Sequence, residues 1–255
     1  MQIYVISIET ENSPRLMNFI GQSFFKDPTV NYQKIGIKGA DLTTKDYFEL
    51  AVKGRSQSLS PGEVGCTLSH IEALKQFLVS GDDYALILED DAILPQKLTL
   101  ANLENEVKAV NLPSNIILSL GGIQMKECRK VRGVYKETLF FKKTVLEVVP
   151  DFYHRVCYTV AYIVDQAMAQ TLINYHSMLR RADDWSYLFD FDSNAHIYMT
   201  YLVDHPVIEA GEKNQQLSTI EAERELKKDL AQSQFGANIR RNFAKILYKK
   251  YKIDG

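Results

Sequence analysis

The acidic run Glu89-Asp90-Asp91 directly follows the most continuously apolar stretch of this sequence, residues 84–88. Such an uninterrupted apolar run is typical of a central strand covered on both faces. Carboxylates at the end of a buried strand repel one another and lose hydration, and a divalent cation relieves both effects. We expect Glu89 and Asp91, at i and i+2 of an extended segment, to share Mg²⁺ or Mn²⁺, with Asp90 facing another part of the ligand. The alternative is a solvated acidic turn.

Paired acids at the end of a strand occur in several classes of phosphate-binding protein, including phospho-acceptor receiver domains and nucleotide-sugar transferases. A receiver domain carries its acids after the first strand of a much shorter chain. Glu89 lies more than a third of the way along this 255-residue sequence, which favours a transferase.

A helix is predicted to begin at Pro61, because proline is favoured in the first turn of a helix. Val64 and later apolar residues mark one buried face, and Glu63, Cys66 and His70 fall on a second stripe beside it. Glu63 and His70 are two turns apart, too far for direct contact but close enough to line one wall of a pocket. A hydrogen-bonded core histidine is the ordinary alternative for His70.

Three stretches, in this order and spacing, resemble glycosyltransferase family 25. They are Val5-Ile6-Ser7 followed by Arg15, the sequence GEVGCTLSH at 62–70, and LILEDD at 86–91. This family contains lipopolysaccharide and lipooligosaccharide galactosyltransferases and collagen galactosyltransferases, and the resemblance extends over about residues 2–215. It implies a GT-A type fold, a UDP-sugar donor (most often UDP-galactose), a divalent metal ion and inversion at the anomeric carbon.

The resemblance also implies residue roles. The residues it places against the donor are Ser7, Arg15, Glu63, His70, Glu89 and Asp90. For the metal ion it implies Glu89 and Asp91, with His205 after the last predicted strand completing the ligand set. The planar guanidinium of Arg15 suits a diphosphate or uracil, and a surface charge is its alternative. A surface histidine is the alternative for His205.

An inverting single displacement requires a base that takes the proton of the acceptor hydroxyl. Asp183-Asp184-Trp185 supplies two carboxylates beside an aromatic ring on which a sugar could stack, and family 25 has a similar acidic pair at this place. We predict Asp184 as the base, with Asp183 as second candidate. The alternative is that one of them is the N-cap of a helix running through Leu188.

Strands are expected near 3–8, 84–88, 115–120, 139–149, 156–164 and 196–203, with helices after Pro14, from Pro61 and over 166–175. This interleaving predicts an α/β layer fold with a mostly parallel sheet. Combined with the resemblance, the predicted class is α/β, GT-A type, with a Rossmann-like mixed sheet flanked by helices. The expected division is a glycosyltransferase domain over 1–215 and a helical C-terminal tail over 216–255.

The end of the tail is basic, because residues 238–255 contain six basic side chains and one acidic side chain. Ile239, Phe243, Ile246 and Leu247 recur among them at helical spacing. This pattern predicts either a basic amphipathic helix that contacts an anionic membrane or a helix docked on its own domain. The net charge of −2 for the whole chain gives no general attraction to nucleic acid, so we expect no nucleic-acid partner.

Cys66, Cys128 and Cys157 are scattered, with no CxxC pair and no histidine expected at ligand spacing, so neither a structural zinc nor a disulfide framework is predicted. The first residues resemble no signal peptide, and no apolar run reaches the length of a membrane span. The expected location is therefore the cytoplasm, with peripheral contact at the inner face of the inner membrane through residues 238–255.

The expected function is transfer of a hexose, most often galactose, from a UDP-sugar donor to a lipooligosaccharide-type glycan or glycolipid acceptor by a metal-dependent inverting enzyme. One alternative is a noncatalytic module that binds sugar nucleotides or glycans. The other is a phosphoryl-transfer or receiver protein that uses Glu89-Asp90-Asp91.

Overall fold

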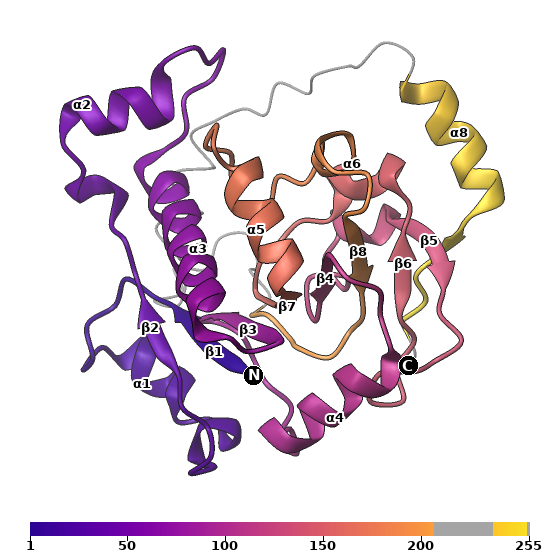
Figure 1. Ribbon diagram of the computed structural model, residues 1–255, viewed down its shortest axis with the longest axis horizontal. Coiled ribbons are helices and arrows are strands. Elements are labelled where there is room, and N and C mark those ends of the chain that lie inside the picture. Colours follow the sequence, from indigo (N-terminus) through magenta and orange to yellow (C-terminus); the bar gives the residue numbers. More distant parts are fainter. Residues whose placement is uncertain (207–236, 254–255) are drawn as a thin grey trace.

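The computed structural model describes residues 1–206 and 237–253, in which nine strands form one mixed sheet (Figure 1). The strand order across the sheet is β2-β1-β3-β7-β4-β8-β6-β5-β9. The strands are β1 (Gln2–Ile6), β2 (Gln33–Ile35), β3 (Tyr84–Glu89), β4 (Ile116–Ser119), β5 (Arg132–Tyr135), β6 (Leu146–Val148), β7 (Ala161–Asp165), β8 (His196–Met199) and β9 (Lys249–Lys250).

Both faces of the sheet are covered, and neighbouring residues of β1 point into different cores. Tyr4 packs in one cluster with Phe77 and Leu172, whereas Ile3 packs in another with Leu103. The predicted α/β class, with a mixed sheet flanked by helices, is confirmed. The helices are α1 (Pro14–Ile20), α2 (Thr44–Tyr47), α3 (Pro61–Ser80), α4 (Leu100–Val110), α5 (Gln166–Tyr175), α6 (Leu188–Phe191) and α8 (Ala237–Leu247).

Strand direction departs from the expectation of a mostly parallel sheet. β1 runs parallel to β2 and to β3, and β4 runs parallel to β8. β7 lies antiparallel between β3 and β4, and the pairings of β5, β6 and β9 are also antiparallel. The prediction was wrong because β7 is an apolar strand whose pattern is the same in either direction.

The helix predicted from Pro61 is α3. Ser60 accepts a hydrogen bond from the backbone N–H of Glu63, and Glu63 Oε2 accepts one from the N–H of Ser60 at 2.7 Å, which forms a capping box. The helix ends at Gly81, whose φ of 77° is favoured by glycine. Its apolar residues are buried against α5 and the sheet, and Figure 1 shows α3 and α5 side by side on one face.

Two glycines let the loop after β2 lie directly against the first turns of α3. This loop forms a 3₁₀ turn, η2 (Gly39–Asp41). A Cβ on Gly65 would lie 2.5 Å from the carbonyl oxygen of Ile37, and one on Gly39 would lie 1.9 Å from that of Pro61. Since these neighbours are backbone atoms, no side chain fits at either position. The GEVGCTLSH stretch is therefore held against the loop that follows the β1–β2 pair.

Some predicted strands are shorter in the structure. The stretch 139–149 contributes only β6, because a tight turn joins Phe140 to Lys143 with positive φ at Phe141 and Lys142. The stretch 156–164 begins as a loop after the 3₁₀ segment that ends at Arg155, so that β7 starts at Ala161. The helix predicted over 166–175 is α5, with the bounds expected.

The described end of the C-terminal tail is attached to the main body. Ala244 of α8 is buried in the core beside the 3₁₀ segment η5 (Pro150–Arg155), and β9 extends the sheet by pairing with β5. The boundary predicted at residue 215 and the segment 216–236 lie outside the described residues. No helix in the described part of the chain has the length and hydropathy required to cross a bilayer.

Candidate functional site

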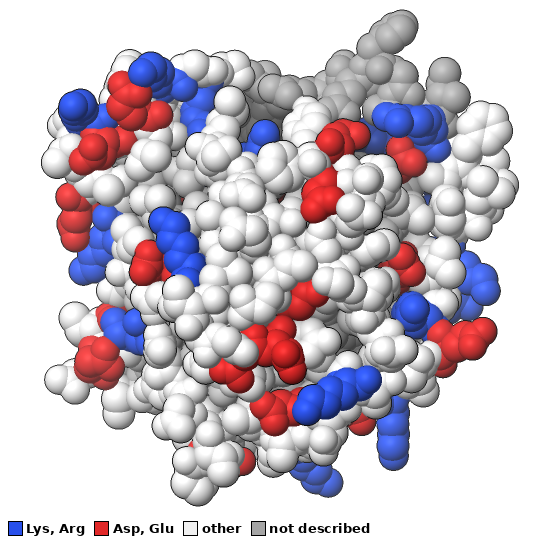
Figure 2. Space-filling model, in the orientation of Figure 1, with Lys and Arg blue, Asp and Glu red and all other residues white. Residues whose placement is uncertain are grey.

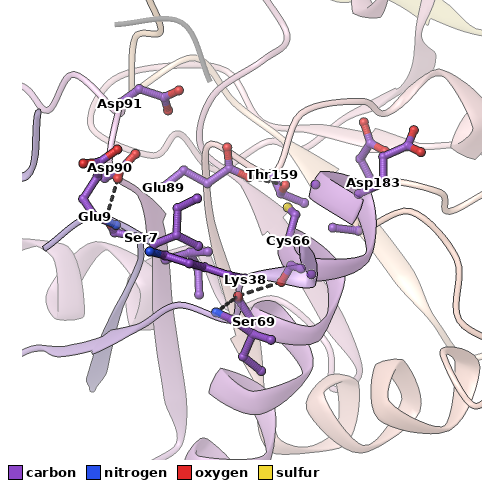
Figure 3. Close-up of a pocket in the computed structure, with 18 of the residues that line it drawn as sticks. Ser7, Glu9, Lys38, Cys66, Ser69, Glu89, Asp90, Asp91, Thr159 and Asp183 are labelled. Carbon is purple, nitrogen blue, oxygen red and sulfur yellow. Dashed lines mark hydrogen bonds between the residues drawn. The ribbon is translucent and has the colours of Figure 1, made fainter. Parts of the chain in front are cut away.

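A pocket lies where β1 and β3 end, beside the first turns of α3. These strands are parallel, and Ile6 pairs with Glu89, so the residues that follow them, Ser7 and Asp90, are neighbours. Figure 3 shows the acidic run, Ser7 and Cys66 around this pocket. Its charged lining comprises Glu9, Arg15, Lys38, Glu63, Glu89, Asp90, Asp91, Arg181, Asp183 and His205.

Both carboxylate oxygens of Asp90 have partners within the protein. Ser7 Oγ donates to its Oδ2 at 2.5 Å, and Arg15 Nε donates to its Oδ1 at 2.6 Å. The Arg15 side chain is 18% exposed and also contacts Asp91 Oδ2 at 3.1 Å. Burial raises the pKa of Asp90, although Arg15 and Ser7 oppose this. The guanidinium predicted to meet the donor thus pairs with two acids of the run, at the edge of the pocket.

Glu89 has different partners. Thr159 Oγ1 donates to Glu89 Oε1 at 2.5 Å, and His70 Nε2 lies 3.4 Å from the same oxygen. Burial raises the pKa of Glu89, but His70 and Thr159 outweigh it and lower that pKa to about 2. His70 Nδ1 lies 2.8 Å from the hydroxyl of Tyr162 on β7. His70 is therefore buried on the far side of Glu89 from the pocket, and it affects the pocket by contacting this carboxylate.

Asp91 does not continue the strand. β3 ends at Glu89, and the backbone N–H of Ala92 donates to the carbonyl of Glu89 at 3.1 Å, which closes a turn. The expectation of an extended segment in which Glu89 and Asp91 point the same way was therefore wrong. Asp91 Oδ2 instead lies 3.4 Å from His205 Nε2. Burial opposes the charge on His205, but Asp91 outweighs it and raises the pKa of the imidazole.

The predicted metal ligands fall into two groups. Asp91 and His205 are in contact, and Glu89 faces the same pocket from the end of β3. Within the described residues, the three ligand atoms that lie within 4.8 Å of one another belong to another set, Cys66, His70 and Glu89. The expectation that no histidine lies at ligand spacing from a cysteine was therefore wrong, because Cys66 and His70 are one helical turn apart on α3.

Glu63 lines the pocket, and it also forms the capping box at the start of α3. The Glu63 side chain therefore has a structural role in addition to the role toward the donor that was expected from the sequence. Its side chain is buried, with 8% exposed. Since Oε2 accepts from the N–H of Ser60, the carboxylate holds the start of the helix beside the acidic run.

Asp183 and Asp184 are separated by the fold. Asp183 lines the pocket, and its Oδ2 accepts from the backbone N–H of Tyr158 at 3.4 Å. Asp184 Oδ1 accepts a hydrogen bond from the backbone N–H of Ser186. Asp184 is not among the described residues that line the pocket. Neither is an N-cap, because α6 begins at Leu188 after Tyr187.

Trp185 was expected to offer its ring to a sugar, and the structure contradicts this. The residue is 4% exposed and packs in the core, where its ring lies 6.3 Å from that of His176. Residues 182–187 lie between α5 and α6 and are not helical, so helical spacing could not predict which of them are buried. An aromatic platform for the acceptor is not formed by this residue.

Four further residues shape the pocket without having been predicted from the sequence. Thr159 lies just before β7 and holds Glu89 directly, and Tyr162 lies in β7 and holds Glu89 through His70. Lys38 and Arg181 bring cationic side chains from two separate loops. No motif indicates them, because Thr159 and Tyr162 reach Glu89 through the pairing of β7 with β3, and Lys38 reaches the pocket through the pairing of β2 with β1.

The matches to known proteins agree with the arrangement of the acidic run and α3. Residues 1–187 match the family model described as glycosyltransferase family 25 (LPS biosynthesis protein). The chain belongs to glycosyltransferase family 25. Membership places it among the glycosyltransferases of lipopolysaccharide biosynthesis. The matched range ends at Tyr187 and therefore includes the whole acidic run, α3 and Asp183.

The other comparisons add little to the family 25 assignment. No curated protein matches the chain. A solved structure described as A197 from STIV is similar, with a TM-score of 0.42 and 14% identity over 82% of this chain and 87% of that one. This similarity carries no argument about activity.

The Arg15 contacts lead to a stability prediction. Arg15→Met leaves the buried carboxylate of Asp90 without its cation and Asp91 with His205 alone, so we expect the free energy of unfolding at pH 7 to fall by about 3 kcal/mol. The loss should shrink toward pH 4, because a protonated carboxyl group needs no counter-charge.

Denaturant unfolding at both pH values measures this effect. Lys53→Met is the control, since Lys53 and Glu49 form an exposed i,i+4 pair whose loss should change stability by less than about 0.5 kcal/mol. Equal stability of Arg15→Met and the wild type at pH 7 would contradict the buried ion pair.

Proposed function

We propose that this family 25 protein is an inverting galactosyltransferase that uses UDP-galactose and Mn²⁺ or Mg²⁺ to galactosylate a lipooligosaccharide-type acceptor. The observation that carries the proposal is the convergence of the acidic run, Ser7 and the first turns of α3 on one pocket at the ends of parallel strands. Ligands of α/β sheets bind at such strand ends.

The side chains in the pocket fit a hard divalent cation. Asp91 Oδ1 is buried and has no hydrogen-bond partner among the described residues, so it offers an oxygen ligand. His205 Nε2 lies beside the other oxygen of Asp91, and Glu89 opens to the same space. A cation held by these three residues would offset the charge that develops on a departing diphosphate.

Charge balance also favours a cation together with the donor. Six carboxylate residues line the pocket, against the cationic side chains of Arg15, Lys38 and Arg181 and the imidazole of His205. A diphosphate would be repelled by this excess, because like charges in a partly desolvated site interact strongly. We propose that Lys38 and Arg181 contact the diphosphate, while Arg15 and Ser7 fix Asp90 in place.

Asp183 is the base in this proposal. It lines the pocket, and Figure 3 shows it across the pocket from Ser7. A base in this position can accept the proton of an acceptor hydroxyl as that oxygen attacks the anomeric carbon. Asp184, the first candidate from sequence, is turned toward Ser186 instead.

A donor screen tests the activity. With Mn²⁺ and a truncated lipooligosaccharide acceptor, we expect UDP release from UDP-galactose, and we expect Asp91→Ala to lower that rate at least about a hundredfold by removing charge stabilisation. Asp190→Ala changes an exposed acid of α6 and should retain the rate. UDP binding without turnover of any donor would identify a noncatalytic module, and turnover independent of added metal and of EDTA would contradict the proposed metal site.

A matched pair of variants tests the base. We expect Asp183→Asn to lower kcat by about a hundredfold or more with little change in the KM for the donor, since general-base catalysis contributes about 10²–10⁴. Asp184→Asn, one residue away, should keep most of the activity. Initial rates at saturating donor measure both, and the reverse result would assign the base to Asp184.

We also propose that α8 contacts an anionic membrane surface at the cytoplasmic face. Ala244 attaches the helix to the body, while the side chains of Phe243, Ile246 and Leu247 are 64%, 81% and 72% exposed. Basic residues of the same helix flank them, and Figure 2 shows mostly uncharged surface over α8 with basic groups beside it. This combination suits a helix that lies in the headgroup region.

Serine substitutions at Phe243, Ile246 and Leu247 together should weaken binding to phosphatidylglycerol vesicles at least about tenfold, because three apolar side chains are no longer buried in lipid. Vesicle sedimentation measures the change. Val79→Ser is the control, since Val79 is 85% exposed on another helix. Unchanged binding by the triple variant would contradict the proposal.

A further inference from the structure

A second set of metal-ligating side chains lies at the inner wall of the pocket. Cys66 and His70 are one turn apart on α3 and so lie on the same side of the helix, facing Glu89 at the end of β3. One ligand atom from each residue lies within 4.8 Å of the other two. Cys66 and Glu89 also line the pocket, and Figure 3 shows both side chains directed toward Thr159.

The surroundings of His70 orient one ring nitrogen toward this cluster. Nδ1 lies 2.8 Å from the hydroxyl of Tyr162, and burial raises the pKa of Tyr162, so that it remains a neutral hydroxyl. When Nδ1 carries the proton and donates to Tyr162, Nε2 presents its lone pair toward Glu89, 3.4 Å away. A ligating histidine typically has such a partner on its other nitrogen.

We propose that Cys66, His70 and Glu89 form a binding site for Zn²⁺. A thiolate, an imidazole and a carboxylate suit zinc, whereas Mg²⁺ and Mn²⁺ prefer oxygen ligands. Zinc bonds of about 2.0–2.3 Å place the ligand atoms about 3.5 Å apart. His70 Nε2 and Glu89 Oε1 already lie 3.4 Å apart, and no two of the three ligand atoms are more than 4.8 Å apart. On binding, the Cys66 thiol proton leaves to solvent and the sulfur bonds the metal.

The site differs from a structural zinc site, because three protein ligands leave a fourth position facing the pocket. Glu89 belongs both to this set and to the ligands proposed for Mn²⁺ or Mg²⁺. Zinc bound here removes Glu89 from the second set, so it inhibits the transferase in competition with the activating cation. This consequence rests on the proposed function, whereas zinc binding itself does not.

Cobalt substitution tests the site without measuring activity. Co²⁺ added to the full chain should give a sulfur-to-cobalt charge-transfer band in the near ultraviolet, and one equivalent of Zn²⁺ should abolish it. The band should be absent in Cys66→Ser and retained in Cys157→Ser, which removes a comparably half-buried thiol. Tyr162→Phe should weaken Co²⁺ binding by about tenfold, because His70 loses its orienting partner.

Each outcome of the cobalt titration either supports or overturns the proposed zinc site. Absence of a charge-transfer band in the wild type, or its persistence in Cys66→Ser, overturns the zinc site. Loss of the band in Cys157→Ser with retention in Cys66→Ser places the thiolate elsewhere and also overturns it. Thermal unfolding of each variant without metal verifies that the fold is intact, and His70→Gln provides a second variant if Cys66→Ser fails to fold.

Competition is measured separately. Zn²⁺ should inhibit Mn²⁺-supported UDP release by the wild type, and added Mn²⁺ should relieve the inhibition. For Cys66→Ser, measured against its own Mn²⁺-supported rate, the zinc concentration that halves the rate should rise at least about tenfold. If no donor is turned over, the proposed function fails while the cobalt spectra still decide the zinc site. Equal inhibition of both proteins overturns the competition.

Discussion

Three adjacent carboxylates at the end of a buried strand are stable only if each finds a positive charge or a hydrogen-bond donor. In this protein the partners come from separate parts of the chain. Arg15 and Ser7 neutralise Asp90, Thr159 and His70 hold Glu89, and other segments complete the set. Desolvation would otherwise force the acids to take up protons. The pocket therefore exists because the surrounding elements converge to satisfy the acidic run.

This constraint explains how the site is divided. Asp90 is enclosed by Ser7 and Arg15, so its role is to anchor the loop after β1 and the first helix to the end of β3. Asp91 retains a buried oxygen without a partner among the described residues, which leaves it able to bind a ligand. Glu89 lies between α3 and β7, where a change at its carboxylate reaches His70 and Tyr162. One acid is structural and two remain available for chemistry.

Much of the framework follows from local patterns. Proline and a capping box define the start of α3, and the alternation along β1 divides its side chains between two cores. The acidic run is visible because it interrupts an apolar strand. Local patterns do not predict strand direction, since a fully buried strand has the same apolar pattern whether it runs parallel or antiparallel. The placement of β7 between β3 and β4 therefore could not be predicted.

The sequence by itself determined the strand before the acidic run, the helices α3 and α5, the acidic run itself and the family, because these depend on residue order and short-range spacing. Tertiary structure alone decided which acid keeps an oxygen without a hydrogen-bond partner among the described residues, that Asp183 rather than Asp184 reaches the pocket, and that Trp185 is buried. It also brought Cys66 and His70 against Glu89. The physical reason is that charge neutralisation and burial are set by neighbours distant in sequence, and no local pattern records which segments will meet.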